Sequence, residues 1–156
     1  MGYALIPFVV LMLTLGLRAE AQRQVNRVAG ADLRADIAAE TRALQAEVFA
    51  AACVVAAQAQ TGVVSDALAV TWPAGLTALP GATCATRQDG TGRLVFAGVP
   101  ATPGAAGVLI ERLDGPAFWY VVPVVGSARA IVSGQTVSVP ATFASGTLLY
   151  QGRIAQ

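Results

Sequence analysis

The feature that most constrains the fold is residues 33–60, a segment without Pro or Gly. It is rich in Ala, Leu, Gln, Arg and Glu, which are strong helix formers. Apolar residues recur along it at steps of seven, four, three and four, at Ile37, Leu44, Val48, Ala51 and Val55. This spacing returns to one face of a helix, so we predict an amphipathic helix that packs on a sheet through this stripe. A coiled-coil seam is the alternative, but the Ala-rich register is short for one.

The first 17 residues form an apolar run without a charged side chain. A helix of that length is about 25 Å long, the short end of what crosses a bilayer core. We therefore predict a transmembrane anchor at residues 1–17. A signal peptide cleaved after Ala21 is the main alternative, although no Arg or Lys precedes the apolar run. A buried core helix is the third.

Basic residues follow the predicted anchor, at Arg18, Arg23, Arg27 and Arg34. Counted alone, they place the carboxyl-terminal domain in the cytoplasm. A disulfide between Cys53 and Cys84 would place it in the periplasm, because disulfides persist in oxidising compartments. Such a bond would contribute about 3–4 kcal/mol in the chain-entropy model. The alternative is that Cys53 is a small buried apolar residue with a free thiol.

The composition excludes most familiar active sites. The chain has no His, and all ten of its basic residues are Arg. The commonest general base and zinc ligand are therefore missing, as are Schiff-base and phosphate-loop lysines. The net charge of +1 gives no field to gather nucleic acid. We expect no catalytic residue, no metal or cofactor, no small-molecule substrate and no nucleic acid, and hence no enzyme.

The remainder of the chain, residues 61–156, is predicted to form a small α+β domain with an antiparallel sheet. Gly62 is expected to end the long helix. Residues 73–92 are expected to be mostly loop, and 104–114 a helix or a strand. Expected strands are residues 93–97, 118–122, 128–132, 136–139 and 147–150. With the anchor at 1–17 and a juxtamembrane and amphipathic helix at 18–60, the predicted fold is pilin-like.

The order of these parts resembles a type IV pilin or pseudopilin, although residues 3–17 lack the early glutamate of pilins. The carboxyl-terminal sequences GVLIERLDGPAFWYVV and ARAIVSGQTVSVPATFASGTLLY resemble the PilM family of type IVb and conjugative thin-pilus operons. The residues that carry this likeness are Val132-Ser133, Val139-Pro140 and Gly146-Thr147-Leu148-Leu149. The resemblance implies a bitopic protein of the bacterial inner membrane, with a periplasmic carboxyl-terminal domain and no catalytic residues.

The function that the resemblance implies is a non-enzymatic inner-membrane part of type IV pilus or related secretion assembly. Such a protein acts by contacts with pilus assembly proteins or pilins, as a homo- or hetero-oligomer, and touches the membrane through residues 1–17. Two alternatives stay open. One is a minor pilin or pseudopilin built into the filament. The other is a secreted binding module that begins at Gln22.

Overall fold

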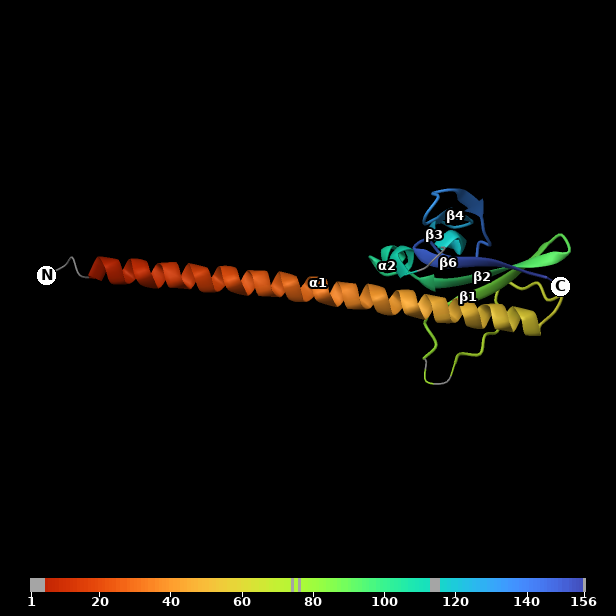
Figure 1. Ribbon diagram of the computed structural model, residues 1–156, viewed down its shortest axis with the longest axis horizontal. Helices are drawn as coiled ribbons and strands as arrows, with labels where there is room; N and C mark the ends of the chain where they lie inside the picture. Colours follow the sequence, from red (N-terminus) through yellow and green to blue (C-terminus); the bar gives the residue numbers. More distant parts are fainter. Residues whose placement is uncertain (1–4, 74, 76, 113–115, 156) are drawn as a thin grey trace. The chain divides into compact units, whose positions relative to one another are not determined.

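The computed structural model describes residues 5–73, 75, 77–112 and 116–155, with side chains from residue 30 onward except that of residue 116. It divides into two compact units, Met1–Ile37 and Ala38–Gln156. The helix α1 (Leu5–Ala59) supplies the described part of the first unit and begins the second (Figure 1). The predicted class, α+β with an amino-terminal helix and an antiparallel sheet, is confirmed.

Helix α1 begins well before residue 33 and ends close to the predicted position. It continues through Gly30 without a break. Gly62 follows its end with a φ of +76°, a conformation that glycine adopts at little cost. Two short helical elements follow later in the chain, α2 (Ala105–Arg112) and the 3-10 turn η1 (Pro116–Phe118).

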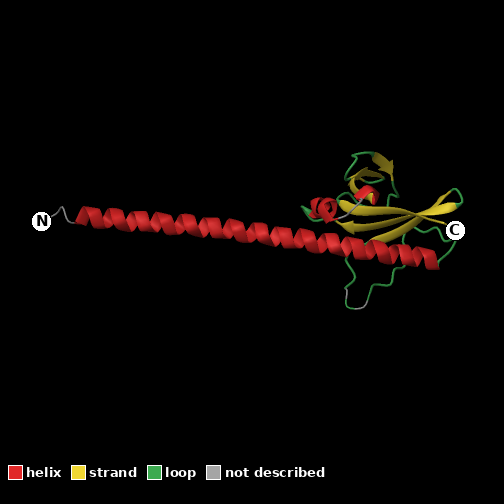
Figure 2. Ribbon diagram, viewed as in Figure 1, coloured by secondary structure: helices red, strands yellow, loops and turns green. Residues whose placement is uncertain are grey.

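A six-stranded antiparallel sheet forms the rest of the second unit (Figure 2). Its spatial order is β1-β2-β6-β3-β4-β5. The strands are β1 (Thr83–Asp89), β2 (Gly92–Pro100), β3 (Trp119–Val124), β4 (Ser127–Ala130), β5 (Thr136–Ser138) and β6 (Thr147–Ala155). The central strands β2 and β6 pair along their whole lengths, from Gly92 opposite Ala155 to Pro100 opposite Thr147.

Residues 83–89 correct one prediction, because they form β1 and not a loop. Their sequence, TCATRQD, carries few large apolar residues, so periodicity gave no strand signal there. The strand is set by its partner. Asp89 lies opposite Gly92 across a tight turn, and β1 pairs with the strongly apolar β2 along seven residues.

One face of the sheet carries α1 and α2. Helix α1 contributes a row of small side chains at Ala43, Ala46, Ala50, Cys53 and Ala57, with Phe49 beside it. These residues pack with Val95, Ala97 and Val99 of β2 and with Leu148 of β6. The other face has its own core, in which Phe96 and Leu149 pack with Val122 and Phe143. Neighbouring residues of one strand, such as Leu148 and Leu149, thus serve opposite cores, as the period of two requires.

The predicted packing stripe of α1 is not its buried face. Ile37, Leu44 and Val55 are exposed, and Val48 is only partly buried. The sheet instead meets the alanine row, because small side chains let the helix backbone come close to the strands. The prediction followed the larger apolar residues and therefore identified the wrong face of α1 as the buried one.

The predicted membrane location is also corrected. Within the part of the chain that the structure describes, no helix is both long enough and apolar enough to cross a bilayer. This finding overturns the prediction of a bitopic inner-membrane protein. The side chains of the predicted anchor, residues 1–17, lie outside the described residues.

Candidate functional site

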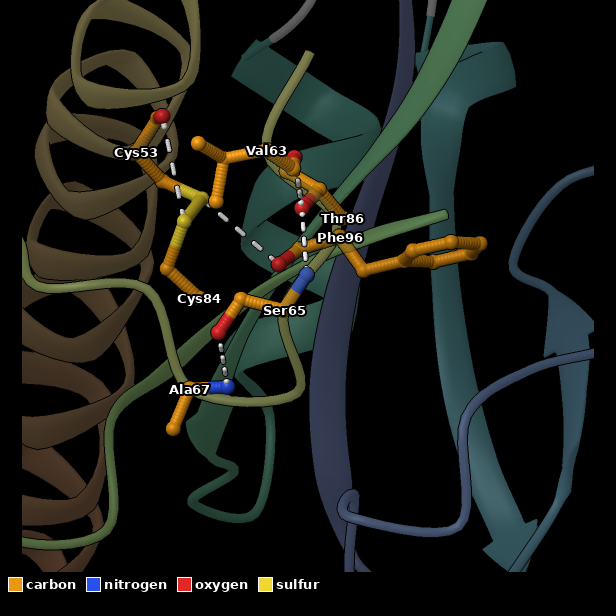
Figure 3. The surroundings of a disulfide bond; sticks show 7 residues. All are labelled: Cys53, Val63, Ser65, Ala67, Cys84, Thr86 and Phe96. Atoms are coloured by element: carbon orange, nitrogen blue, oxygen red, sulfur yellow. Dashed lines mark hydrogen bonds between the residues drawn. A yellow bond between two sulfur atoms is a disulfide. The ribbon is translucent and has the colours of Figure 1, made fainter. Parts of the chain in front are cut away.

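A disulfide fixes the carboxyl-terminal part of α1 to the edge of the sheet. It joins Cys53 of α1 to Cys84 of β1, with the two Cα atoms 5.7 Å apart (Figure 3). Both cysteines are buried in the core between helix and sheet. The predicted pair is therefore bonded, and the alternative of a free thiol at Cys53 is wrong.

The segment that follows α1 runs along the outer edge of β1. The Thr86 backbone N–H donates to the Ser65 carbonyl at 2.8 Å, and the Leu68 N–H donates to the Cys84 carbonyl at 2.7 Å. The Thr86 hydroxyl donates to the Val63 carbonyl at 2.9 Å and accepts from the Ser65 N–H at 3.0 Å (Figure 3). An exposed strand edge invites pairing with other chains. Here the chain itself covers this part of the edge.

A buried arginine closes the end of α1. Arg93 of β2 is fully buried, and its guanidinium donates to the carbonyls of Ala57 at 2.6 Å, Gln60 at 2.8 Å and Val63 at 2.8 Å. The last carbonyls of a helix lack partners within it and carry partial negative charge. Among the side chains that the structure describes, no carboxylate pairs with Arg93. The guanidinium thus donates to one carbonyl of α1 and to two carbonyls of the segment that follows it.

Large apolar side chains project from α1 on its exposed side. Leu33 and Ile37, in the first unit, are 61% and 56% exposed. We call these two residues the α1 ridge. Their spacing of four residues places them along one side of the helix. Leu44, in the second unit, is 41% exposed. Exposed apolar residues at regular helical spacing are typical of a surface that binds another helix or a groove.

A groove continues along α1 beyond the ridge, and we call it the α1 groove. Its floor is α1 from Val48 to Ala59 together with Gln60, and its wall is the segment from Ala69 to Pro73. The volume is about 640 Å³, within the range of small-ligand pockets. Trp72 stands in the wall and stacks on Phe49, with ring centroids 5.0 Å apart. None of the described residues that line the groove is charged.

Ion pairs join α2 to α1, and β1 to the segment that follows α1. Arg112 at the end of α2 lies 3.3 Å from the Glu40 carboxylate and 3.9 Å from that of Glu47, both on α1. Arg87 and Asp66 form another pair. These contacts hold α2 and the segment after α1 in place.

The chemistry of this surface is apolar recognition. In the described part of the chain, no three His, Cys, Asp or Glu side chains gather as metal ligands would. The groove offers methyl groups, one indole ring and few polar atoms, which suits the apolar face of a peptide or helix. The groove can therefore bind an apolar partner and exclude water from the contact.

The predicted site residues fall into three groups. Cys53 and Cys84 are joined. The residues predicted as the packing stripe lie instead at the surface of α1: Ile37, Leu44, Val48 and Val55. The last two line the groove. The side chains of Arg18, Arg23 and Arg27 lie outside the described residues. Sequence reasoning missed the helix-closing role of Arg93 and the groove wall at Trp72; the Trp72-Pro73 pair gave the only signal, an extended backbone after the helix.

Comparisons with known protein families, with curated proteins and with solved structures find no match to this chain.

Proposed function

We propose that this chain is a non-enzymatic structural subunit of a type IV pilus or a related secretion filament, in the manner of a minor pilin or pseudopilin. Its partners are other subunits or assembly proteins of that filament. The observation that carries the proposal is the exposure of large apolar side chains on α1, namely those of the α1 ridge and, within the second unit, Leu44 and Val55. Apolar surface of this kind marks protein interfaces.

The two faces of α1 suit two different contacts, one with the sheet of the same chain and one with a partner. The alanine row binds α1 to its own sheet, where close approach matters most. Leu33, Ile37 and Leu44 are not needed for that contact, so their size serves contacts outside the chain. A chain with only 12% charged residues also has little charged surface to keep copies apart.

The carboxyl-terminal unit has the features expected of a head domain that works outside a reducing compartment. Its disulfide joins helix to sheet, and disulfides persist where thiols are not kept reduced. The resemblance of residues 107–150 to a pilus-biogenesis family points the same way. The order of an amino-terminal helix followed by an antiparallel sheet resembles that of pilins.

Recovery with sheared filaments tests the proposal. Filaments are sheared from the cells that make this chain and sedimented, and the untagged chain is detected by mass spectrometry. We expect the wild-type chain in the pellet and an at least tenfold loss of Ile37→Glu, because a carboxylate on the ridge must be desolvated in any apolar contact. Val124→Glu is the matched control, since Val124 is 64% exposed on β3, away from α1.

Two results would contradict this function. One is absence of the wild-type chain from the filaments together with unchanged filament yield in its deletion strain. The other is equal recovery of wild type and Ile37→Glu. The disulfide-bonded mass of each variant in whole cells shows whether it folded.

A further inference from the structure

The segment that covers the edge of β1 is held there mainly by hydrogen bonds. We call residues 63–68 the edge strap. Its apolar side chains at Val63 and Val64 are 40% and 48% exposed, and Asp66 is exposed as well. Leu68 is the one residue of the strap that is buried in the core. A segment with so few buried apolar contacts opens more readily than the strand that it covers.

The backbone of the edge strap pairs with β1 as an incomplete antiparallel strand. The Thr86 N–H donates to the Ser65 carbonyl, and the Leu68 N–H donates to the Cys84 carbonyl. Between these two bonds the strap has one residue more than β1, as in a β-bulge. The Ala67 N–H donates to the Ser65 hydroxyl at 3.2 Å. The strap therefore covers the edge but does not continue the sheet as a regular strand.

Thr86 is the residue of β1 that holds the strap through its side chain. It is fully buried, and its hydroxyl donates to the Val63 carbonyl and accepts from the Ser65 N–H (Figure 3). The Val63 carbonyl also accepts from the guanidinium of Arg93. A buried polar group that loses its partner costs free energy. The Thr86 hydroxyl and the strap therefore stabilise each other.

We propose that the edge strap is an autoinhibitory contact, which keeps the edge of β1 from pairing with the same edge of a second copy. The inference goes beyond the proposed function and does not rest on it, because it concerns a surface that the folded chain withholds. An uncovered strand edge presents N–H and C=O groups to any other strand. In an antiparallel pair centred on Thr86, each copy donates its Thr86 N–H to the Thr86 carbonyl of the other.

The charges of β1 fit pairing between two copies in this register. Arg87 would lie opposite Ala85 of the second copy. Asp89 would lie opposite Thr83, so no like charges would face each other. In the closed chain Arg87 instead pairs with Asp66 of the strap. The strap thus occupies both the backbone edge and the basic side chain beside it.

Removal of the Thr86 hydroxyl tests this role of the strap. The purified full chain is compared as wild type, Thr86→Val and Thr83→Val, by amide hydrogen exchange and by light scattering over a range of concentrations. Thr86→Val keeps the shape of the side chain but removes both of its hydrogen bonds, so the amide at position 86 should exchange about ten- to hundredfold faster. The mass of this variant should exceed that of wild type, because open edges pair.

Thr83→Val is the matched control and should have the exchange rates and the mass of wild type. It makes the same replacement on β1, before the first contact of the strap at Cys84.

A proline at position 88 shows whether the edge of β1 is the contact. Gln88 lies two residues after Thr86, so its backbone N–H points to the same side of the strand. Proline there removes a donor from the edge and leaves the hydrogen bonds to β2 in place. The double variant Thr86→Val, Gln88→Pro should therefore open the strap and yet keep the mass of wild type.

Four results would overturn the inference. They are unchanged exchange at position 86 in Thr86→Val, faster exchange without a rise in mass, a rise in mass that Thr83→Val shares, and a double variant that associates as Thr86→Val does. Circular dichroism and the disulfide-bonded mass verify that each variant is folded. If Thr86→Val does not fold, Asp66→Ala at the exposed end of the ion pair takes its place. Its mass should also exceed that of wild type, and an unchanged mass would overturn the inference as well.

Discussion

The guanidinium of Arg93 donates a 2.6 Å hydrogen bond to the backbone carbonyl of Ala57, which links β2 to the last turn of α1. The same side chain donates to the carbonyls of Gln60 and Val63 in the segment that follows the helix. One buried cation thus holds the end of α1 and the start of the next segment together. The groove floor, Val48 to Gln60, ends at this point, so Arg93 also fixes the position of the candidate binding surface.

Replacement of Arg93 should destabilise the fold. Arg93→Met keeps much of the buried volume but removes every donor, and we expect a loss of about 3 kcal/mol because hydrogen bonds from a charged group are lost and the carbonyls stay behind. Urea unfolding followed by circular dichroism measures it as a lower midpoint at unchanged slope. Arg153→Met is the matched control, since that side chain is 63% exposed and its ion pair is a surface one. Equal midpoints for the two variants would refute the structural role of Arg93.

Loss of the disulfide should cost more than loss of an ordinary core contact. Cys53 and Cys84 are 31 residues apart in the sequence, and a loop of that length corresponds to about 3–4 kcal/mol in the chain-entropy model. The free energy of unfolding of the double variant Cys53→Ala, Cys84→Ala should be lower by that amount, which urea unfolding measures as a lower midpoint. Reductant should lower the stability of the wild type toward that of the variant and leave the variant unchanged. A wild type whose stability does not change on reduction would contradict the assignment.

Replacement by alanine should change the free energy of unfolding in opposite directions at two glycines. A Cβ at Gly98 would lie 2.5 Å from the Phe143 ring and 2.8 Å from the Thr147 side chain, so Gly98→Ala should destabilise by about 1–3 kcal/mol. A Cβ at Gly107 in α2 would meet nothing within 4 Å. Gly107→Ala should therefore stabilise the helix by about 0.5–1 kcal/mol. Thermal unfolding of the two variants against wild type checks both signs.

Much of the fold could be predicted because its elements carry strong local signals. The long run without Pro or Gly gave α1, and the continuous apolar run Phe118–Val122 gave the strand that became β3. The disulfide followed from the presence of only two cysteines. Strand β1 could not be found in this way, because its pairing with β2, and not its own composition, makes it a strand.

The orientation of α1 could not be predicted from its apolar pattern. Two apolar stripes coexist on the helix, one of alanines and one of larger residues, and periodicity alone does not say which faces the sheet. The sheet selects the alanines because they permit closer packing. The role of Arg93 could not be predicted either, because it depends on where α1 ends in space relative to β2.

The assignment of the two faces of α1 can be tested by placing a larger side chain on the buried face and a smaller one on the exposed face. Ala43 is fully buried, so Ala43→Leu should push α1 away from the sheet and destabilise the chain by about 1–3 kcal/mol. Leu44, its neighbour in sequence, is 41% exposed, so Leu44→Ala should change the free energy of unfolding by no more than about 0.5 kcal/mol. Urea unfolding of the two proteins measures both changes. A large loss of stability in Leu44→Ala, with none in Ala43→Leu, would contradict the assignment and would restore the stripe that the sequence pattern favours.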